Sequence, residues 1–272
     1  QFENVSGPSS SWVCDTRQMK YLGDLVDPKA PGNEWRSAES WPPPNRPRSY
    51  FLQPNGKLSR DPVSSSTKTE TAITYSYDPK DPVPTKGGNN LIFGGRGPVD
   101  QRGIKDRKDY LRFVSDPLER AVEMAGRVRC QLFVDSDAPD TDFVAKLIDV
   151  YPDGYEALVL DGIIRARYRE GLMKEIPLEK GKVVTVEIDL WSTAYAFHQG
   201  HKISVHITSS NDPRFDPNPN TGDATRANDE KRVAKNTVHF SAARPSRILL
   251  PILRDGSVEP SSKKGGGKRE RN

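Results

Sequence analysis

Apolar and polar residues alternate in several short runs along the chain. In 127–134, for example, Val128, Cys130, Leu132 and Val134 fall on one side, and charged or amide residues fall on the other. A period of two residues places all apolar side chains of a strand on one face of a sheet. We therefore predict a β-strand in each segment with this alternation: 73–77, 127–134, 158–166, 182–190, 202–208 and 238–240.

The apolar run RILLPIL at 247–253 is a further expected strand. The total comes to about nine strands, at the spacing of β-sandwiches. Thr193–Phe197 is the one stretch that we expect to make a helical turn. Antiparallel strands with one apolar side bury that side between two sheets and leave the other side to solvent or to another layer. These features predict an all-β chain built as a sandwich of two antiparallel sheets, with a jelly-roll order of strands.

The composition is that of a polar, ordered body. The chain has 272 residues, of which 34% are hydrophobic and 29% are charged, and its mean hydropathy is -0.73. No stretch approaches the roughly 20 consecutive apolar residues that a membrane-spanning helix needs, so we expect no membrane segment. Because the chain begins at Gln1, we expect either a processed product or part of a longer protein.

Charge and proline content divide the chain into three predicted parts. Residues 261–272 contain five basic residues, one acidic residue and no apolar residue, so they carry as much charge as the net +4 of the whole chain. Such an end cannot pack, and we expect a disordered basic tail over 255–272. Nucleic-acid binding through this tail is a hypothesis that we rank below a solvated tail. We predict an N-terminal extension or linker over 1–31 and one sandwich domain over 32–254.

Proline-rich segments flank the first predicted strands. Residues 1–47 read as an extended lead-in that wraps a surface, with Trp12, Trp35 and Trp41 as candidate anchors in a neighbouring core. The Gly/Pro/Asn-rich segment 78–104 is a long loop, and loops of this length usually have a role. We expect it to cover a sheet edge or to shape a binding face.

Signatures of the common catalytic and cofactor sites are missing. There is no GxSxG nucleophile elbow, and GGRG at 94–97 lacks the spacing of a dinucleotide-binding motif. Cys14 and Cys130 belong to no CxxC or Cys/His cluster, which argues against a zinc site and a disulfide framework. His198 and His201 are separated by a turn-forming glycine and have no third ligand nearby. We therefore predict no catalytic residue, no metal site and no cofactor, and we interpret Cys130 as a buried apolar residue.

The densest group of carboxylates lies in the segment DSDAPDTDF. Its members are Asp135, Asp137, Asp140 and Asp142. The favoured interpretation is a tight turn whose carboxylates pair with the basic residues of GIIRARYR, which are Arg165, Arg167 and Arg169. Calcium binding is a second hypothesis, although the sixth position of an EF-hand loop is not Gly and Lys146 replaces the bidentate Glu. A domain interface is the third.

A second polar cluster lies in the loop SSNDPRFDPNPNTG at 209–222. Its candidate residues are Asn211, Arg214, Asp216, Asn218 and Asn220. Proline and Asn/Asp residues are typical of rigid turns, because proline fixes one backbone angle and the short polar side chains bond to nearby backbone groups. We interpret the loop either as a rigid structural element or as the lining of a ligand cleft.

Five long motifs run from residue 32 to residue 222. They are GNEWRSAESWPPP (32–44), SDAPDTDF (136–143), LIDVYPDG (147–154), GIIRARYREG (162–171) and IDLWSTAYAFHQGHKISVHITSSNDPRFDPNPNTG (188–222). Together they resemble the C-terminal domain of X-Pro dipeptidyl-peptidase-like and CocE/NonD hydrolases, and the resemblance spans about 32–254. It implies a non-catalytic jelly roll, similar to galactose-binding domains, that packs on an α/β-hydrolase domain carrying the catalytic Ser, Asp and His.

The resemblance carries no catalytic residue onto this chain, because residues 1–31 contain neither a nucleophile elbow nor a recognisable triad histidine. It implies that the aspartate turn and the FDPNPNTG loop help a hydrolase domain to form a cleft for a peptide or acyl-ester substrate. We therefore predict an accessory function in a serine hydrolase. The alternative is a free-standing carbohydrate- or ligand-binding module that stacks its ligand on Trp191, Tyr195 or Phe215.

Overall fold

Strands dominate the computed structural model, which describes residues 10–12, 36–64, 71–90, 95, 97–223, 230–254 and 259–260. In this part of the chain the regular elements are the strands β1 to β14 and two short 3-10 helices, η1 (Gln101–Ile104) and η2 (Ala166–Tyr168). The prediction of an all-β chain is confirmed.

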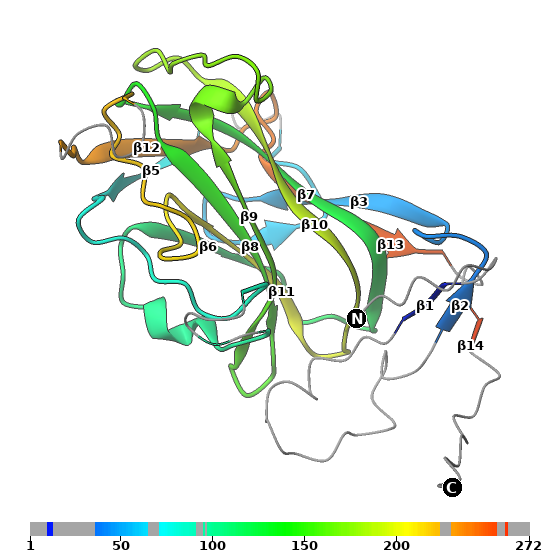
Figure 1. Cartoon of the computed structure of the whole chain (residues 1–272). Helices are drawn as coiled ribbons and strands as arrows, with labels where there is room; N and C mark the ends of the chain where they lie inside the picture. The colour runs from blue at the N-terminus through cyan, green and yellow to red at the C-terminus, as the bar shows by residue number, and fades with distance from the viewer. Residues whose placement is uncertain are drawn as a thin grey trace, which may run out of the picture.

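Most strands belong to two antiparallel sheets (Figure 1). The seven-stranded sheet has the order β4-β3-β13-β7-β12-β5, and β10 also pairs with β7. Its strands are β3 (Asn45–Leu52), β4 (Leu58–Ser59), β5 (Ala72–Tyr77), β7 (Val122–Ser136), β10 (Val184–Phe197), β12 (Ala234–His239) and β13 (Arg247–Leu253). The four-stranded sheet has the order β6-β11-β8-β9. Its strands are β6 (Tyr110–Val114), β8 (Asp142–Val150), β9 (Glu156–Arg165) and β11 (Lys202–Thr208).

Three short strands form a separate antiparallel sheet beside these two. They are β1 (Ser10–Trp12), β2 (Arg36–Ala38) and β14 (Glu259–Pro260). Figure 1 shows them next to the end of β13, so the two ends of the described chain meet on one side of the molecule.

The predicted alternating segments form the strands that line the core. In β7, Val128, Cys130, Leu132 and Val134 are fully buried, while Arg127 points to solvent. The apolar sides of β8, β10 and β11 belong to the same core cluster. Burial of Cys130 is as predicted, and it raises the pKa of the thiol. The period-two pattern therefore identified both the strands and their inward faces.

The predicted helical turn at Thr193–Phe197 is wrong. These residues continue β10, which pairs with β7 as far as Phe197 opposite Val122. Residues 194–197 are all buried, so this half of the strand is covered on both faces. A strand that is covered on both faces shows no alternation of apolar and polar residues. The sequence pattern therefore gave no strand signal here.

The long segment 78–109 covers the outer face of the four-stranded sheet. The Val99 carbonyl accepts the backbone N–H of Leu158 in β9 at 3.3 Å. The Gln101 side-chain oxygen lies 3.4 Å from Nζ of Lys146 in β8. All nine residues of β8 are buried, because the core lies on one side of this strand, and segment 78–109 together with residues 209–222 lies on the other. The role predicted for the loop over 78–104 was to cover a sheet edge or to shape a binding face. The bridge between Asp100 and Ala157 places it along β9, the edge strand of this sheet, and it extends over the outer face as well.

Trp41 is anchored on the seven-stranded sheet. Together with Ala38 and Leu253 it packs against Ala125 of β7 and Ala194 of β10. The proposed anchor Trp35 lies outside the described residues, as do most of the predicted extension over 1–31 and all of the predicted tail over 255–272 except Glu259 and Pro260, which form β14.

Candidate functional site

The turn between β7 and β8 carries the predicted aspartates. Ser136, the last residue of β7, accepts the backbone N–H of Ala138 through its Oγ at 3.1 Å, which turns the chain ahead of Asp140. Asp142 is the first residue of β8 and lies opposite Arg165, the last residue of β9. The register of the sheet therefore brings a carboxylate and a guanidinium together at one edge.

Asp142 and Arg165 form an ion pair with two hydrogen bonds. Arg165 donates from Nε to Oδ1 at 2.9 Å and from Nη2 to Oδ2 at 3.0 Å. Only 2% of the Asp142 side chain is exposed. Burial raises the pKa of the Asp142 carboxyl, and the bond from Arg165 opposes this effect. Because the planar guanidinium matches the carboxylate, the pair fixes orientation as well as distance.

Asp140 and Arg167 form a second and more deeply buried pair. The Asp140 carboxylate accepts the backbone N–H of Arg167 at 2.9 Å and its Nε–H at 2.8 Å. Burial lowers the pKa of Arg167, but the bonds and charges of Asp140 and Glu175 together outweigh burial, and the net shift of the pKa is upward. Arg167 lies in η2, so the alternation predicted for Arg165, Arg167 and Arg169 ends where β9 ends.

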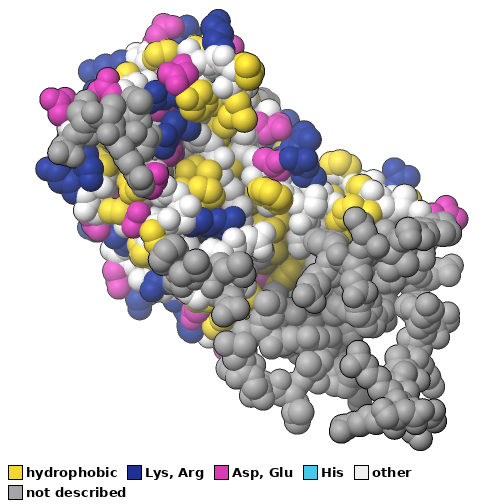
Figure 2. Space-filling view, in the orientation of Figure 1, with side chains coloured by type: hydrophobic (Ala, Val, Ile, Leu, Met, Phe, Trp, Pro, Cys, Tyr) yellow, Lys and Arg dark blue, Asp and Glu magenta, His cyan; other side chains and the backbone are white. Residues whose placement is uncertain are grey.

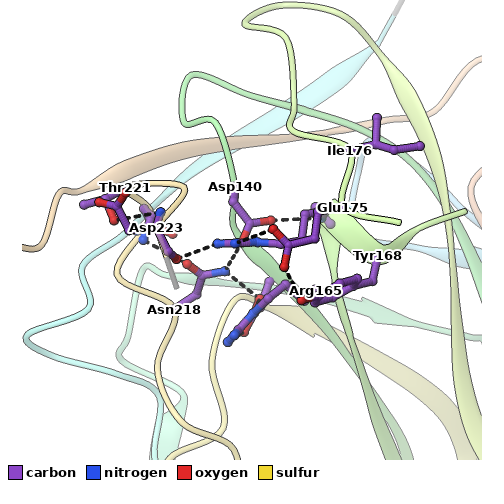
Figure 3. A network of polar contacts seen from close by, with 12 residues as sticks. Asp140, Arg165, Tyr168, Glu175, Ile176, Asn218, Thr221 and Asp223 are labelled. Atoms are coloured by element: carbon purple, nitrogen blue, oxygen red, sulfur yellow. Dashed lines mark hydrogen bonds and ion pairs between the residues drawn. The ribbon is translucent and has the colours of Figure 1, made fainter. Parts of the chain in front are cut away.

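Arg167 also reaches two other loops. Its Nη2 donates to the Asp223 carbonyl at 2.8 Å, and its Nη1 lies 3.4 Å from Oε2 of Glu175. The Tyr168 hydroxyl donates to the same Glu175 carboxylate at 2.5 Å. Figure 3 shows these side chains gathered near Asp140, from the β9–β10 connection and from the segment that contains Asn218 and Asp223.

Asn218 joins the two aspartates. Its Nδ2 donates to Oδ2 of Asp140 and to Oδ1 of Asp142, both at 2.8 Å. Its Oδ1 accepts the Asn220 N–H at 2.9 Å, and its backbone carbonyl accepts the Tyr77 hydroxyl at 3.1 Å. Asn220 has a φ of 65°, a backbone conformation that Asn tolerates better than most residues. The predicted aspartate turn, arginine segment and 209–222 loop are therefore one buried network.

Two of the predicted aspartates lie apart from this network. Asp137 accepts the Lys235 N–H at 2.9 Å and lies 3.6 Å from Arg232, at the edge of β12. Asp216 is exposed at the surface of the 209–222 loop.

Asn211 and Arg214 bind a different partner, Asp161 of β9. Asn211 donates to Oδ2 of Asp161 at 2.9 Å, and Arg214 donates to Oδ1 at 2.5 Å. The Arg214 guanidinium also lies over the ring of Phe215, 5.1 Å from its centroid. The polar groups at the start of the loop thus hold the loop onto the four-stranded sheet.

Two buried titratable groups lie under segment 78–109, and neither was predicted. Burial lowers the pKa of Lys146 to about 8. Burial, together with the charges of Lys146 and Arg112, lowers the pKa of His206 to about 3, so its ring is neutral at ordinary pH. Both residues fall on the polar side of their strands. Only the position of segment 78–109, which covers that side, reveals that they are buried.

A further buried contact joins His201 to Asp149. Nδ1 of His201 lies 2.9 Å from Oδ1 of Asp149, and the Tyr195 hydroxyl donates to Oδ2 of Asp149 at 3.0 Å. The ring of His198 stacks on His201 at 5.2 Å. Among the described residues, no group of three or more His, Cys, Asp or Glu side chains has the arrangement of a metal site.

An open pocket of about 860 Å³ lies between β5 and residues 103–109. Acidic and basic side chains alternate around it, including Asp78, Asp109, Arg107 and Lys235. None of the residues predicted for a cleft lines this pocket. Nor does the described part of the chain contain a helix with the length and apolar character needed to cross a membrane.

The geometry of the buried network indicates a structural rather than a chemical role. The carboxylates of Asp140 and Asp142 already accept bonds from Arg165, Arg167 and Asn218. A general acid or base must reach a substrate proton, and these groups are buried and engaged. What the network does is to fix three loops at one end of the sandwich.

Known proteins match this chain over most of its length. The model of the X-Pro dipeptidyl-peptidase C-terminal non-catalytic domain matches residues 12–249. Cocaine esterase from Rhodococcus sp. (strain MB1 Bresler) is 42% identical over 231 residues, which are 82% of this chain and 40% of the esterase.

Two solved structures are similar at 30% sequence identity. An aminopeptidase from a marine sediment archaeon, Thaumarchaeota archaeon, has a TM-score of 0.75 over 82% of this chain and 39% of its own. An α-amino acid ester hydrolase has a TM-score of 0.72 over 81% of this chain and 39% of its own. The chain therefore spans about two fifths of the length of each of these relatives.

Proposed function

The chain belongs to the family of X-Pro dipeptidyl-peptidase C-terminal non-catalytic domains, and from this membership we propose that it is the accessory β-sandwich of a serine hydrolase. In this proposal it packs on an α/β-hydrolase catalytic domain and shapes the substrate cleft of that domain. We extend the proposal to a jelly-roll order of strands in a domain over 32–254, between an extension over 1–31 and a basic tail over 255–272.

The observation that carries the proposal is the buried network around Asp140. It ties the β7–β8 turn, the β9–β10 connection and the 209–222 loop into one rigid end of the sandwich. Loops that are held in this way present a fixed surface to a neighbour, because their polar side chains satisfy one another. Such a surface suits the wall of a cleft whose catalytic groups come from another domain.

The names of the relatives suggest the class of substrate. They include an esterase, an α-amino acid ester hydrolase and an aminopeptidase. All three names describe cleavage at an acyl carbon, in an ester or an amide. We therefore propose that the hydrolase completed by this domain cleaves an acyl ester or a peptide.

A carbohydrate-binding module is the alternative, and one observation favours it. Trp191 is 68% exposed, as a stacking residue must be. The other two predicted stacking residues are covered: Tyr195 is buried, and Phe215 is half-buried beside the Arg214 guanidinium. A single exposed aromatic supports a sugar site less well than the row of rings that the alternative requires.

A chimera separates these functions. In it, this chain replaces the 231 matched residues of the Rhodococcus cocaine esterase. We expect the chimera to hydrolyse a p-nitrophenyl ester and to react with a fluorophosphonate probe, and the isolated chain to do neither. Activity of the isolated chain, or an inactive chimera, would contradict an accessory role. Binding of the isolated chain to a glycan would favour the alternative.

A further inference from the structure

Trp191 is presented to solvent by an irregular stretch of β10. The pairing of β10 with β7 shifts register between Asp189 and Ser192, so the strand bulges at Trp191. The residue has a φ of 72°, a left-handed conformation that is costly for a bulky side chain. Even so, 68% of Trp191 is exposed. The backbone thus adopts a strained conformation at a residue whose apolar ring is exposed to water.

Neighbouring residues hold the bulge in place. Oδ1 of Asp189 accepts the Trp191 N–H at 3.0 Å, and Arg127 donates to the same carboxylate from both Nε and Nη2. Behind the strand, β9 passes so closely that a Cβ at Gly162 would lie 2.2 Å from the Asp189 carbonyl oxygen. The surroundings therefore impose the conformation of Trp191, which is expected of a strained residue with a function.

The face around Trp191 also receives the start of the described domain. Ser192 and Ala194 lie two residues apart on β10 and thus on the same side of the sheet. Trp41 and Ala38 pack on Ala194, so the chain enters the sandwich about 7 Å along the strand from Ser192. In Figure 1, β7 and β10 cross the middle of the view. Figure 2 shows hydrophobic and charged side chains side by side in the middle of the same view.

Polar groups border the ring on the other side. Arg127 pairs with Asp189, and Arg129 lies 3.3 Å from Glu187, with about half of each side chain of that second pair exposed. An aromatic anchor inside a rim of polar residues is the usual composition of an interface centre, in which Trp and Arg are enriched.

We propose that the surface formed by Trp191 and the outer face of β7 and β10, between Trp41 and the Arg129–Glu187 pair, docks the α/β-hydrolase domain. The inference rests on the proposed function, because it names the face that the catalytic domain occupies. About three fifths of the length of each relative lies outside the part that this chain matches. The match to the C-terminal domain begins at residue 12, the end of β1, and Ser10 of β1 pairs with Ala38, which packs together with Trp41 on Ala194 near Trp191. The entry point and the anchor therefore share one face.

The test compares Trp191→Gly in the isolated chain and in the cocaine esterase chimera described above. Glycine adopts the φ of 72° without strain, so the isolated variant should melt at the same temperature as the unchanged chain or higher. In the chimera the same substitution should lower the melting temperature by several degrees and the rate of ester hydrolysis at least tenfold. If Trp191 only stabilised its own domain, the substitution would change the melting temperature in the same direction in both proteins.

Met173→Ala is the matched control. Met173 is 99% exposed in the β9–β10 connection, outside the strands that form the proposed surface, and its removal should change neither protein. The fluorescence of Trp191 is obtained by subtracting the emission spectrum of Trp191→Phe from that of the unchanged protein. This emission should lie at shorter wavelength in the chimera than in the isolated chain.

Each contrary result has a distinct meaning. A chimera that is inactive without any substitution overturns the proposed function and this inference with it. An active chimera that Trp191→Gly leaves unchanged overturns only the docking surface. Glycan binding or self-association of the isolated chain that is lost in Trp191→Gly assigns the surface to a saccharide or to a second copy, and this also overturns the inference.

Discussion

Asp140 accepts both the backbone N–H and the Nε–H of Arg167, at 2.9 and 2.8 Å, with only 1% of the aspartate side chain exposed. One carboxylate thus fixes the backbone as well as the side chain of the residue that opens the β9–β10 connection. Because Arg167 continues to the Asp223 carbonyl, the pair controls the relative positions of two loops that lie far apart in the sequence.

Asp140→Asn should destabilise the fold strongly. The substitution removes the buried charge opposite Arg167 and leaves it only the longer contact with the exposed Glu175 carboxylate. Breaking a buried pair in this way typically costs about 3–5 kcal/mol. Urea unfolding at pH 7 measures the loss. Glu187→Gln is the control, because its pair with Arg129 is half exposed and should cost less than about 1 kcal/mol. Similar losses in the two variants would contradict the structural role of Asp140.

Lys146→Met should leave stability unchanged or raise it at pH 7. The pKa of Lys146 is lowered from 10.5 to about 8 by burial, so the folded state holds the charged form at a cost. Between pH 8 and pH 10.5 the unfolded chain binds more protons than the folded chain, and the stability of the unchanged protein therefore rises with pH, by up to about 3 kcal/mol. Urea midpoints from pH 7 to 9.5 should show this rise, and Lys146→Met should lack it. If the two proteins showed the same dependence of stability on pH, the lowered pKa of Lys146 would be refuted.

His206 should make the fold sensitive to acid. Its pKa is lowered from 6.5 to about 3 in the folded state. Between pH 6.5 and pH 3 the unfolded chain therefore binds a proton at His206 that the folded chain does not bind. Stability contributed by the neutral ring is complete above pH 6.5 and is lost as the pH falls toward 3, by up to about 4–5 kcal/mol. His206→Gln should flatten this part of the profile. In NMR spectra the His206 ring should not titrate between pH 8 and 4, and titration near 6.5 would disprove the burial.

Gly162→Ala should be costly although the added group is a single methyl. Its Cβ would lie 2.2 Å from the Asp189 carbonyl oxygen, so β9 and β10 would have to move apart. Overpacking of this kind costs about 1–3 kcal/mol. Gly103→Ala is the control, because the nearest atom there is the Cε of Lys86 at 4.0 Å. Thermal unfolding of the two variants should separate them clearly, and equal midpoints would show that the strands are not tightly apposed at Gly162.

Local pattern predicted the strands because one face of each strand meets the core and the other meets polar surroundings. Val128 to Val134 in β7 follow this rule. It failed at Ala194 and its neighbours, where both faces are covered, and at Lys146 and His206, where the polar side is itself enclosed. In all three places a distant segment changes the environment of the strand. The residues next to these positions in the sequence do not indicate that such a segment is present.

The candidate site was predicted in composition but not in its connections. The pairing of the aspartate turn with the arginine segment was predicted from charge, and it is seen in Asp142–Arg165 and Asp140–Arg167. The third predicted arginine, Arg169, instead donates to the backbone carbonyls of Ala166 and Ile176. The role of Asn218, which bridges both aspartates from 76 and 78 residues away, follows from the return of a loop and not from any spacing. Likewise, the sequence did not show that Asn211 and Asn218 bind different aspartates, because this depends on the path of the loop in three dimensions.

The complete enclosure of β8 has a consequence for the dynamics of the domain. A surface loop ordinarily opens independently of the strands beneath it, and its amides exchange with solvent first. Here segment 78–109 forms one wall around β8, so it cannot leave without exposing the Lys146 and His206 side of the sheet. Loop and sheet should therefore open as one cooperative unit, and the amides of β8 should exchange only when the whole sandwich unfolds.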